Sequence, residues 1–198
     1  MNYSSGIHGE LFSITVPNDF QNILFTIVYD GNDVRGTKEI LDARITIPKR
    51  HLMSYDLWED YGANAKSVKS LMKAIQETDN GFFDSIYDAK HYTFLLDEMK
   101  DAILNVCEDS IETRRAVCSF PASHCFESIQ GNMRDGQLYI TINMRSCNAY
   151  KNLMSDLCLG YQIMMEVFKS EIKPQTIFML TANIGSLHIF EEDSKHVL

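Results

Sequence analysis

The sequence predicts an α+β fold, in which a mixed β-sheet and several helices form one domain. Of its 198 residues, 45% are hydrophobic and 23% are charged, which is the composition of a globular chain with a sizeable core. Some segments alternate apolar and polar residues as strands do, and between them lie segments whose apolar residues have the spacing of helices. They do not follow the regular strand–helix–strand order of a doubly wound sheet, which favours α+β. No repeat, low-complexity tract or linker divides the chain, so we expect a single domain over residues 1–198.

The first half of the chain is predicted to hold strands followed by helices. Residues 13–36, SITVPNDFQNILFTIVYDGNDVRG, predict a strand, a turn, a second apolar run and a loop bounded by Gly31 and Gly36. The segment ARITIP alternates apolar and polar residues and ends at a proline, which is typical of a strand. Apolar residues then recur at helical spacing over residues 65–75 and 92–106, and RRAVCSF predicts a further strand.

The second half predicts a hairpin, a buried helix and a last strand. Asp135 and Gly136 form the centre of a turn between CFESIQGNM and LYITINM, which predicts a β-hairpin. Residues 153–168 are mostly apolar and long enough for a buried helix. After Pro174, the segment TIFMLTANIG predicts another strand.

Charge and cysteine content exclude several classes of protein. The chain has 18 Lys and Arg residues and 27 Asp and Glu residues. The resulting net charge of -9 argues against nonspecific binding to nucleic acid or anionic membranes. No apolar run approaches the ~20 residues of a membrane helix, and MNYSSGIHGE does not have the pattern of a signal peptide. The five cysteines form no CxxC pair, which favours free thiols and argues against structural zinc. We therefore expect a cytoplasmic protein without a metal site, and without a nucleic-acid or membrane partner.

Arginines beside small polar residues are candidates for a phosphate site. They occur at Arg35, at Arg114 and Arg115, and at Arg145, near the ends of predicted strands. A guanidinium group matches the oxygens of a phosphate, so these arginines indicate a pocket for a phosphorylated ligand. From charge spacing alone, the alternative is that each arginine forms a solvated ion pair on the surface. No phosphate loop, GxGxxG or HExxH motif is present.

Several motifs in order resemble one enzyme family. RRAV, HCFESIQ, RDGQLYITINMRSC and SLHIF are together similar to the thymidylate synthase superfamily, nearest to the branch of pyrimidine nucleotide hydroxymethylases. That branch carries motifs such as PCxxSxQ, RDGKL, NMRSND and SxHLYER, and RGTKEIL resembles its N-terminal arginine loop. The resemblance is strong over residues 98–192 and weaker over residues 35–48. It implies a sandwich around a large mixed sheet, through which two copies dimerise.

The resemblance implies a catalytic cysteine at Cys125. This residue matches the family nucleophile and lies twenty places before Arg145, at the family's spacing. The nucleophile of these enzymes adds to C6 of the pyrimidine, so that C5 can attack a one-carbon donor. Such a thiolate needs positive surroundings, which nearby arginines supply. Without the resemblance, Cys125 would be interpreted as a small buried hydrophobic residue.

The same resemblance implies a phosphate site that two subunits share. Arg145 and Ser146 match the family's residues on the nucleotide phosphate, and Arg35 matches the loop arginine on the same phosphate. Arg114 and Arg115 match the pair that reaches across the dimer into the partner's site. The implied ligand is a pyrimidine nucleoside monophosphate, bound by a homodimer.

Asp156 indicates the base that is bound. It lies eleven places after Arg145, where thymidylate synthases carry an Asn that recognises the edge of uracil. An ionised carboxylate cannot donate a hydrogen bond to O4, but it accepts one from the N4 amino group of cytosine. The cytidylate hydroxymethylases carry Asp here, so the resemblance favours CMP or dCMP. The alternative is that Asp156 caps the start of a helix after Ser155.

The sugar and the cofactor are implied less directly. His188 matches the family's ribose-contacting histidine, whereas Phe190 replaces a tyrosine, which leaves ribose and deoxyribose as alternatives. The cofactor implied by the family is 5,10-methylenetetrahydrofolate. YDLWEDYG resembles the family's ELLWFLxG helix, so Trp58 is expected to contact the folate, and the family's Glu falls on Tyr55. Asn148 replaces the Asp that contacts the folate. By an analogous match, a residue of the NGFF segment, Phe83, occupies the place of a catalytic tyrosine.

The sequence therefore predicts a transferase that hydroxymethylates C5 of CMP or dCMP through an adduct between Cys125 and C6. Two alternatives stay open. One is thymidylate-type methylation of dUMP at the same site. The other is a diverged dimeric protein that binds a nucleotide without catalysis.

Overall fold

One seven-stranded mixed sheet organises the computed structural model, which describes residues 9–48, 55–77, 116–120, 124–170, 172–173 and 176–197. The strands are β1 (Leu11–Ser13), β2 (Asn32–Val34), β3 (Thr37–Pro48), β4 (Val117–Ser119), β5 (Phe126–Arg134), β6 (Gln137–Asn148) and β7 (Ile177–Phe190). The helices are α1 (Pro17–Asp30), α2 (Tyr55–Asp60), α3 (Ala65–Glu77), α5 (Leu153–Val167) and α6 (Glu191–Ser194). This mixture of helices with a large mixed sheet confirms the predicted α+β class.

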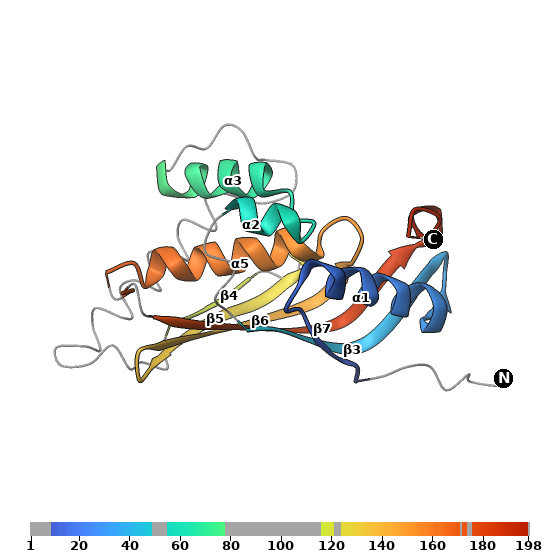
Figure 1. Ribbon diagram of the computed structural model, residues 1–198, viewed down its shortest axis with the longest axis horizontal. Helices are drawn as coiled ribbons and strands as arrows, with labels where there is room; N and C mark the ends of the chain where they lie inside the picture. The colour runs from blue at the N-terminus through green and yellow to red at the C-terminus, as the bar shows by residue number, and fades with distance from the viewer. Residues whose placement is uncertain are drawn as a thin grey trace.

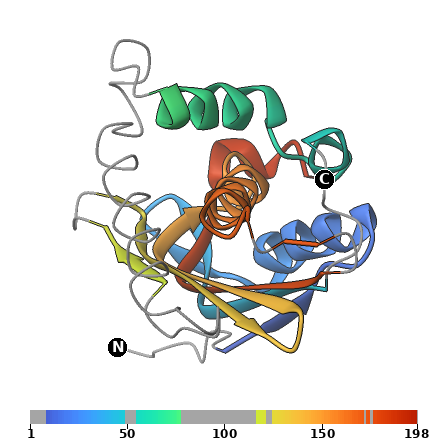
Figure 2. The ribbon, with the colours of Figure 1, turned by 90° about the vertical axis from the view of Figure 1, so that its left-hand side faces the viewer.

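The strand order is β1-β3-β7-β6-β5-β4, and β2 pairs with β3 as well. The β3–β7 and β5–β6 pairs are antiparallel, whereas β1–β3 and β6–β7 are parallel. The helices labelled in Figure 1 cover one face of this sheet, and within the described residues no helix lies on the opposite face. Figure 2 shows α5 lying between the sheet and α3, with α1 beside α5 on the same face. No helix in the described part of the chain combines the length and the apolar character that crossing a membrane requires.

The core lies between the sheet and α5, and it follows the predicted apolar pattern. The segment expected as a buried helix over residues 153–168 is α5, and most of its side chains are buried in the same apolar cluster as those of the sheet. The helix predicted over residues 65–75 is α3, which ends two residues later. Residues 92–106, expected as a helix, lie outside the described part of the chain.

The predicted hairpin is confirmed. Arg134 pairs with Gln137, and the two residues between them have positive φ angles of 48° at Asp135 and 71° at Gly136. Two positive φ angles are what the tight turn of a twisted hairpin requires, and Asp-Gly adopts them readily. The hairpin sets the register that brings the ends of β5 and β6 together.

Residues 13–36 differ from the prediction, because β1 ends at Ser13 and the expected turn forms the start of α1. The second apolar run is α1, and the loop expected between Gly31 and Gly36 contains β2 and a tight hairpin turn into β3. Arg35 and Gly36 occupy this turn with φ angles of 49° and 83°. At the start of α1, the Asp19 carboxylate accepts hydrogen bonds from the backbone of Thr15 and Val16, which satisfies free donors before the helix begins.

Close packing of α5 on β6 depends on a glycine, which gives a first prediction. A Cβ atom at Gly160 would overlap the Cδ1 atom of Ile142, a side chain that is itself fully buried. We expect Gly160→Ala to lower the free energy of unfolding by about 1–3 kcal/mol, although alanine is the better helix former. Urea denaturation followed by circular dichroism measures the change.

The matched variant removes the overlapping atom. In Gly160→Ala with Ile142→Val, the Cδ1 atom is absent, so the double variant should recover part of the lost stability. The single variant Ile142→Val serves as the reference and should cost about 0.5–1.5 kcal/mol. If the urea concentration at the midpoint of unfolding is as high for Gly160→Ala as for the parent protein, or higher, this account of the packing is wrong.

Candidate functional site

The expected nucleophile and the expected phosphate arginine lie side by side. Cys125 directly precedes β5, and its carbonyl oxygen accepts a hydrogen bond of 2.9 Å from the backbone N–H of Arg145 in β6. Both residues are exposed. Pairing of β5 with β6, set by the Asp-Gly turn, thus makes neighbours of two residues that are twenty places apart in the sequence.

Asp156 comes from a different element and contacts Cys147, two residues after Arg145 in β6. It is in the first turn of α5 and is only 3% exposed. The thiol of Cys147, near the end of β6, donates a hydrogen bond to Asp156 Oδ2 over 3.6 Å. Since the helix begins at Leu153 with Asn152 at the N-cap, the alternative interpretation of Asp156 as the helix cap is wrong.

The electrostatics of the site keep the Cys147 thiol protonated. Burial raises the pKa of the Cys147 thiol well above its ordinary value, because a thiolate would be poorly solvated there. The negative charge of Asp156, its hydrogen bond with the thiol, and the charge of Cys125 raise the pKa of Cys147 further. Cys147 is therefore a neutral hydrogen-bond donor at physiological pH.

A second group of expected residues gathers at the ends of β6 and β7. Ser146 is paired with Ser186, and Asn148 with His188, whose carbonyl oxygen accepts a hydrogen bond of 2.8 Å from Ala149. The sheet therefore brings the expected phosphate serine, folate residue and ribose histidine onto two adjacent strands.

Glu39 joins this group and was not expected from the sequence. It pairs with His188 in the register of β3 and β7, and its Oε2 atom accepts a hydrogen bond of 2.7 Å from Ser186. The only signal in the sequence was its place in RGTKEIL, after the expected loop arginine.

Arg35 lies apart from Arg145 along the sheet. It occupies the turn between β2 and β3, close to where Thr37 of β3 pairs with Phe190 of β7. The turn also contacts the start of α6, because the backbone N–H of Glu191 donates a hydrogen bond to the Gly36 carbonyl oxygen. Arg145 instead neighbours Gly185, five residues earlier in β7. The two arginine backbones are therefore at different places along the strands.

Three expected site residues lie outside the described part of the chain. They are Phe83, Arg114 and Arg115.

The two residues expected to contact folate are largely buried. Trp58 is 0% exposed, and its ring lies 5.7 Å from that of Tyr161 within the core. Asn148 is 7% exposed, and its Oδ1 atom accepts a hydrogen bond of 2.9 Å from the backbone of Lys151. In this structure Trp58 stabilises the packing of α2 against α5, and Asn148 stabilises the turn before α5.

A row of irregular positions bends the sheet beside Cys125. Asp42 in β3 has a φ angle of 55°, and it stands with Gly185 of β7 and Arg145 of β6 at a gap in the regular pairing. In β5, Glu127 is the extra residue of a register shift. A bulge re-aims neighbouring side chains, and here the bulge in β5 lies beside unpaired positions in β6, β7 and β3.

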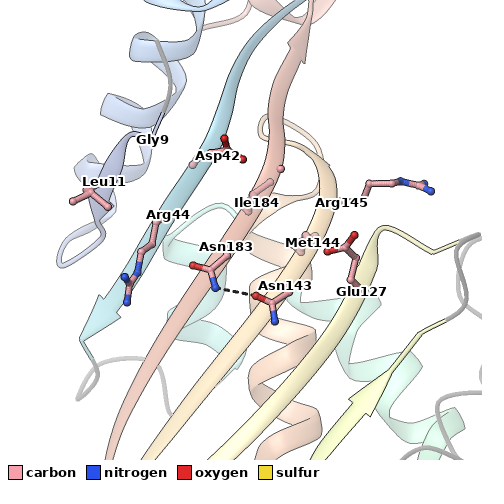
Figure 3. A pocket seen from close by; sticks show the side chains of 12 residues that line it. Gly9, Leu11, Asp42, Arg44, Glu127, Asn143, Met144, Arg145, Asn183 and Ile184 are labelled. Atoms are coloured by element: carbon pink, nitrogen blue, oxygen red, sulfur yellow. Dashed lines mark hydrogen bonds between the residues drawn. The ribbon is translucent and has the colours of Figure 1, made fainter.

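The bend opens a hollow of about 630 Å³ on the face without helices, shown in Figure 3. Arg44 and Arg145 extend from it in different directions, and the carboxylates of Asp42 and Glu127 also line it. At its floor, Asn183 donates a hydrogen bond of 2.9 Å to Asn143. Arg145 thus lies between this outer hollow and the Cys125 site.

The described residues show no metal centre, and no family model matches the chain. Within the described ranges, no group of three or more His, Cys, Asp or Glu side chains is arranged to hold a metal ion. A scan against protein-family models and a search of curated proteins both find no match for this chain. The family resemblance therefore rests on the motifs quoted above.

Exposure of the thiols gives a second prediction. Cys125 is exposed, whereas Cys118, Cys147 and Cys158 are buried. A buried thiol reacts only after local opening, so iodoacetamide should modify Cys125 roughly 100-fold faster than these three. Peptide mapping by mass spectrometry measures each rate and separates the signal of Cys107. In urea the modification rates of these cysteines should become similar. If Cys147 of the native protein were labelled as fast as Cys125, its described burial would be contradicted.

Proposed function

We propose that this protein transfers a one-carbon unit to C5 of a pyrimidine nucleotide, as a hydroxymethyltransferase acting on CMP or dCMP. The observation that supports this best is the placement of an exposed cysteine, Cys125, beside Arg145, with the buried carboxylate of Asp156 in contact with Cys147, two residues after Arg145 in β6. A nucleophile, a cation for a phosphate and an acceptor for an amino group are the groups that this chemistry needs.

In this proposal the thiolate of Cys125 adds to C6 of the pyrimidine, and the electron pair of the C5–C6 double bond moves to C5. C5 then forms a bond to a one-carbon unit at the oxidation level of formaldehyde. The bond between this carbon and the group that carried it breaks, its electron pair leaves with that group, and water takes its place as the hydroxyl group. Loss of the C5 proton and departure of the Cys125 thiolate restore the double bond. Asp156 accepts a hydrogen bond from N4 and so orients the base.

The remaining ligand contacts follow the resemblance. Arg145 and Ser146 hold the phosphate, and the resemblance alone assigns Arg35 to it, since the Arg35 backbone lies apart from Arg145. His188 contacts the sugar from β7, the strand next to β6, which carries Arg145, Ser146 and Asn148.

The proposal includes a homodimer. The sheet face that Figure 1 shows without helices is the expected interface, across which Arg114 and Arg115 complete the phosphate site of the other subunit. Polar side chains linked across β5, β6 and β7, from Ser128 through Asn143 to Asn183, suit a partly hydrated contact on this face.

The one-carbon donor implied by the resemblance is 5,10-methylenetetrahydrofolate. The described residues do not offer the expected contacts, because Trp58 is buried in the core and the Asn148 side chain is occupied by Lys151. We therefore derive no step through the folate, and its participation is tested by adding and omitting it. The free thiols fit a cytoplasmic location for such an enzyme.

A second candidate function is nucleotide binding without catalysis. It is favoured by the same burial of Trp58 and Asn148, since a binding protein needs no folate site. Thymidylate-type methylation of dUMP is the enzymatic alternative, and it requires an amide rather than a carboxylate opposite the base.

The experiment that separates these functions is tritium release from CMP, dCMP and dUMP labelled at C5, each with and without methylenetetrahydrofolate. Release requires both attack at C6 and loss of the C5 proton, so it reports the chemistry whatever the final product is. We expect release from a cytidine nucleotide. Release from dUMP alone would favour the thymidylate-type reaction. Binding without any release would favour the non-catalytic protein.

A further inference from the structure

The contact between Cys147 and Asp156 joins β6 to α5. Cys147 is 2% exposed and Asp156 is 3% exposed, and the thiol sulfur lies 3.6 Å from Oδ2. No role was expected for Cys147 from the sequence, where it stands between Ser146 and Asn148 in an apolar strand. Its partner, however, is the residue that is expected to recognise the base.

The backbone on both sides of this contact is held in place. Ala149 donates a hydrogen bond to His188, Lys151 donates one to the Asn148 side chain, and the N–H of Asp156 donates one to Asn152. These bonds order the turn between β6 and α5. A side chain that must meet a ligand in one orientation needs such a rigid support.

We infer that Cys147 is a positioning residue for base recognition, because its thiol holds Asp156 Oδ2 and so orients the carboxylate toward the exocyclic amino group of a cytosine. This inference rests on the proposed function, in which Asp156 meets the base. The ligand class that it specifies is a cytidine nucleotide rather than a uridine nucleotide.

The chemistry of the pair suits this role. A carboxylate accepts up to about four hydrogen bonds, so a bond from the thiol leaves acceptor capacity for the N4 amino group. The thiol is uncharged, and it orients the carboxylate without neutralising it as a lysine would. A uracil would instead place its O4 acceptor against a carboxylate that is already fixed in position, with no donor between them.

Two substitutions separate hydrogen bonding from packing. Cys147→Val removes the donor and enlarges the side chain by about one methyl group, whereas Cys147→Ser keeps a donor but reduces the volume. Calorimetry measures the affinities for CMP and UMP, and tritium release gives kcat and KM. We expect Cys147→Val to reduce the preference for CMP over UMP roughly tenfold, mainly through KM. We expect Cys147→Ser to retain most of that preference.

The control is Cys158→Ala, which removes another fully buried thiol, from α5, and should leave the preference unchanged. The inference is wrong if Cys147→Val keeps the parental preference for CMP over UMP, or if Cys147→Ser loses as much of this preference as Cys147→Val does. The thiol would then serve only the packing of β6 against α5. If the parent protein itself shows no preference for CMP over UMP, the proposed role of Asp156 fails instead. Thermal melting of each variant verifies that it is folded, and if one variant unfolds, the other decides between donation and packing.

Discussion

Cys125→Ser is expected to abolish tritium release from C5 of the nucleotide, lowering the rate by at least about 10³-fold. A serine hydroxyl is a far weaker nucleophile than a thiolate, so the bond to C6 does not form and the C5 proton is retained. Affinity for CMP should change little, because the exchanged sulfur and oxygen atoms are similar in size and Arg145 remains beside them. Release and equilibrium binding are measured on the same preparation.

Cys118→Ser is the matched control for this substitution. Cys118 lies in β4, the strand next to β5, and its loss removes a thiol without touching the candidate nucleophile. The control should therefore keep its release activity. Persistent release in Cys125→Ser would mean that another group attacks the base, and it would overturn the proposed mechanism.

Local signals in the sequence predicted much of the second half of the fold. The Asp135–Gly136 turn determined the β5–β6 hairpin, because few dipeptides adopt two positive φ angles so readily. The apolar length of α5 similarly predicted a buried helix. Both signals lie within short stretches of chain, so no knowledge of distant partners was needed.

The bend of the sheet could not be predicted in this way. Asp42 has a positive φ angle, and nothing in its neighbours marks it as different from the rest of an alternating strand. The bend arises because Asp42, Gly185 and Arg145 align across β3, β7 and β6. That alignment is a property of the strand register, which includes the pairing of β3 with β7, two segments more than a hundred residues apart.

The candidate site shows the same division. The family resemblance suggested Cys125 and Arg145 as site residues, and the β5–β6 register makes them neighbours. Cys147 was missed because a thiol in an apolar strand has the pattern of a core residue, and only its contact with α5 distinguishes it. Trp58 was expected at a ligand, but an aromatic ring on a short helix above α5 buries more apolar surface by packing against Tyr161.

Asp156→Asn is expected to reverse the base preference, changing the ratio of kcat/KM for CMP to that for UMP by at least about 100-fold. The amide can donate to O4 and accept from N3–H of uracil, which the carboxylate cannot do. It can also still accept the hydrogen bond from the Cys147 thiol through its oxygen, so the buried side chain keeps this partner. The measurement is tritium release from each labelled nucleotide, with dUMP included to test the thymidylate-type reaction.

Asp193→Asn is the control, because Asp193 is also buried but lies in α6, where it pairs with Lys151 at 2.8 Å. Loss of that charge affects the attachment of α6 and leaves the base-recognising carboxylate intact, so the preference for CMP should persist. If Asp156→Asn keeps the parental preference while its turnover survives, residue 156 does not contact the base. The buried pair of Cys147 and Asp156 would then serve the packing of α5 on β6, and base recognition would have to come from another element.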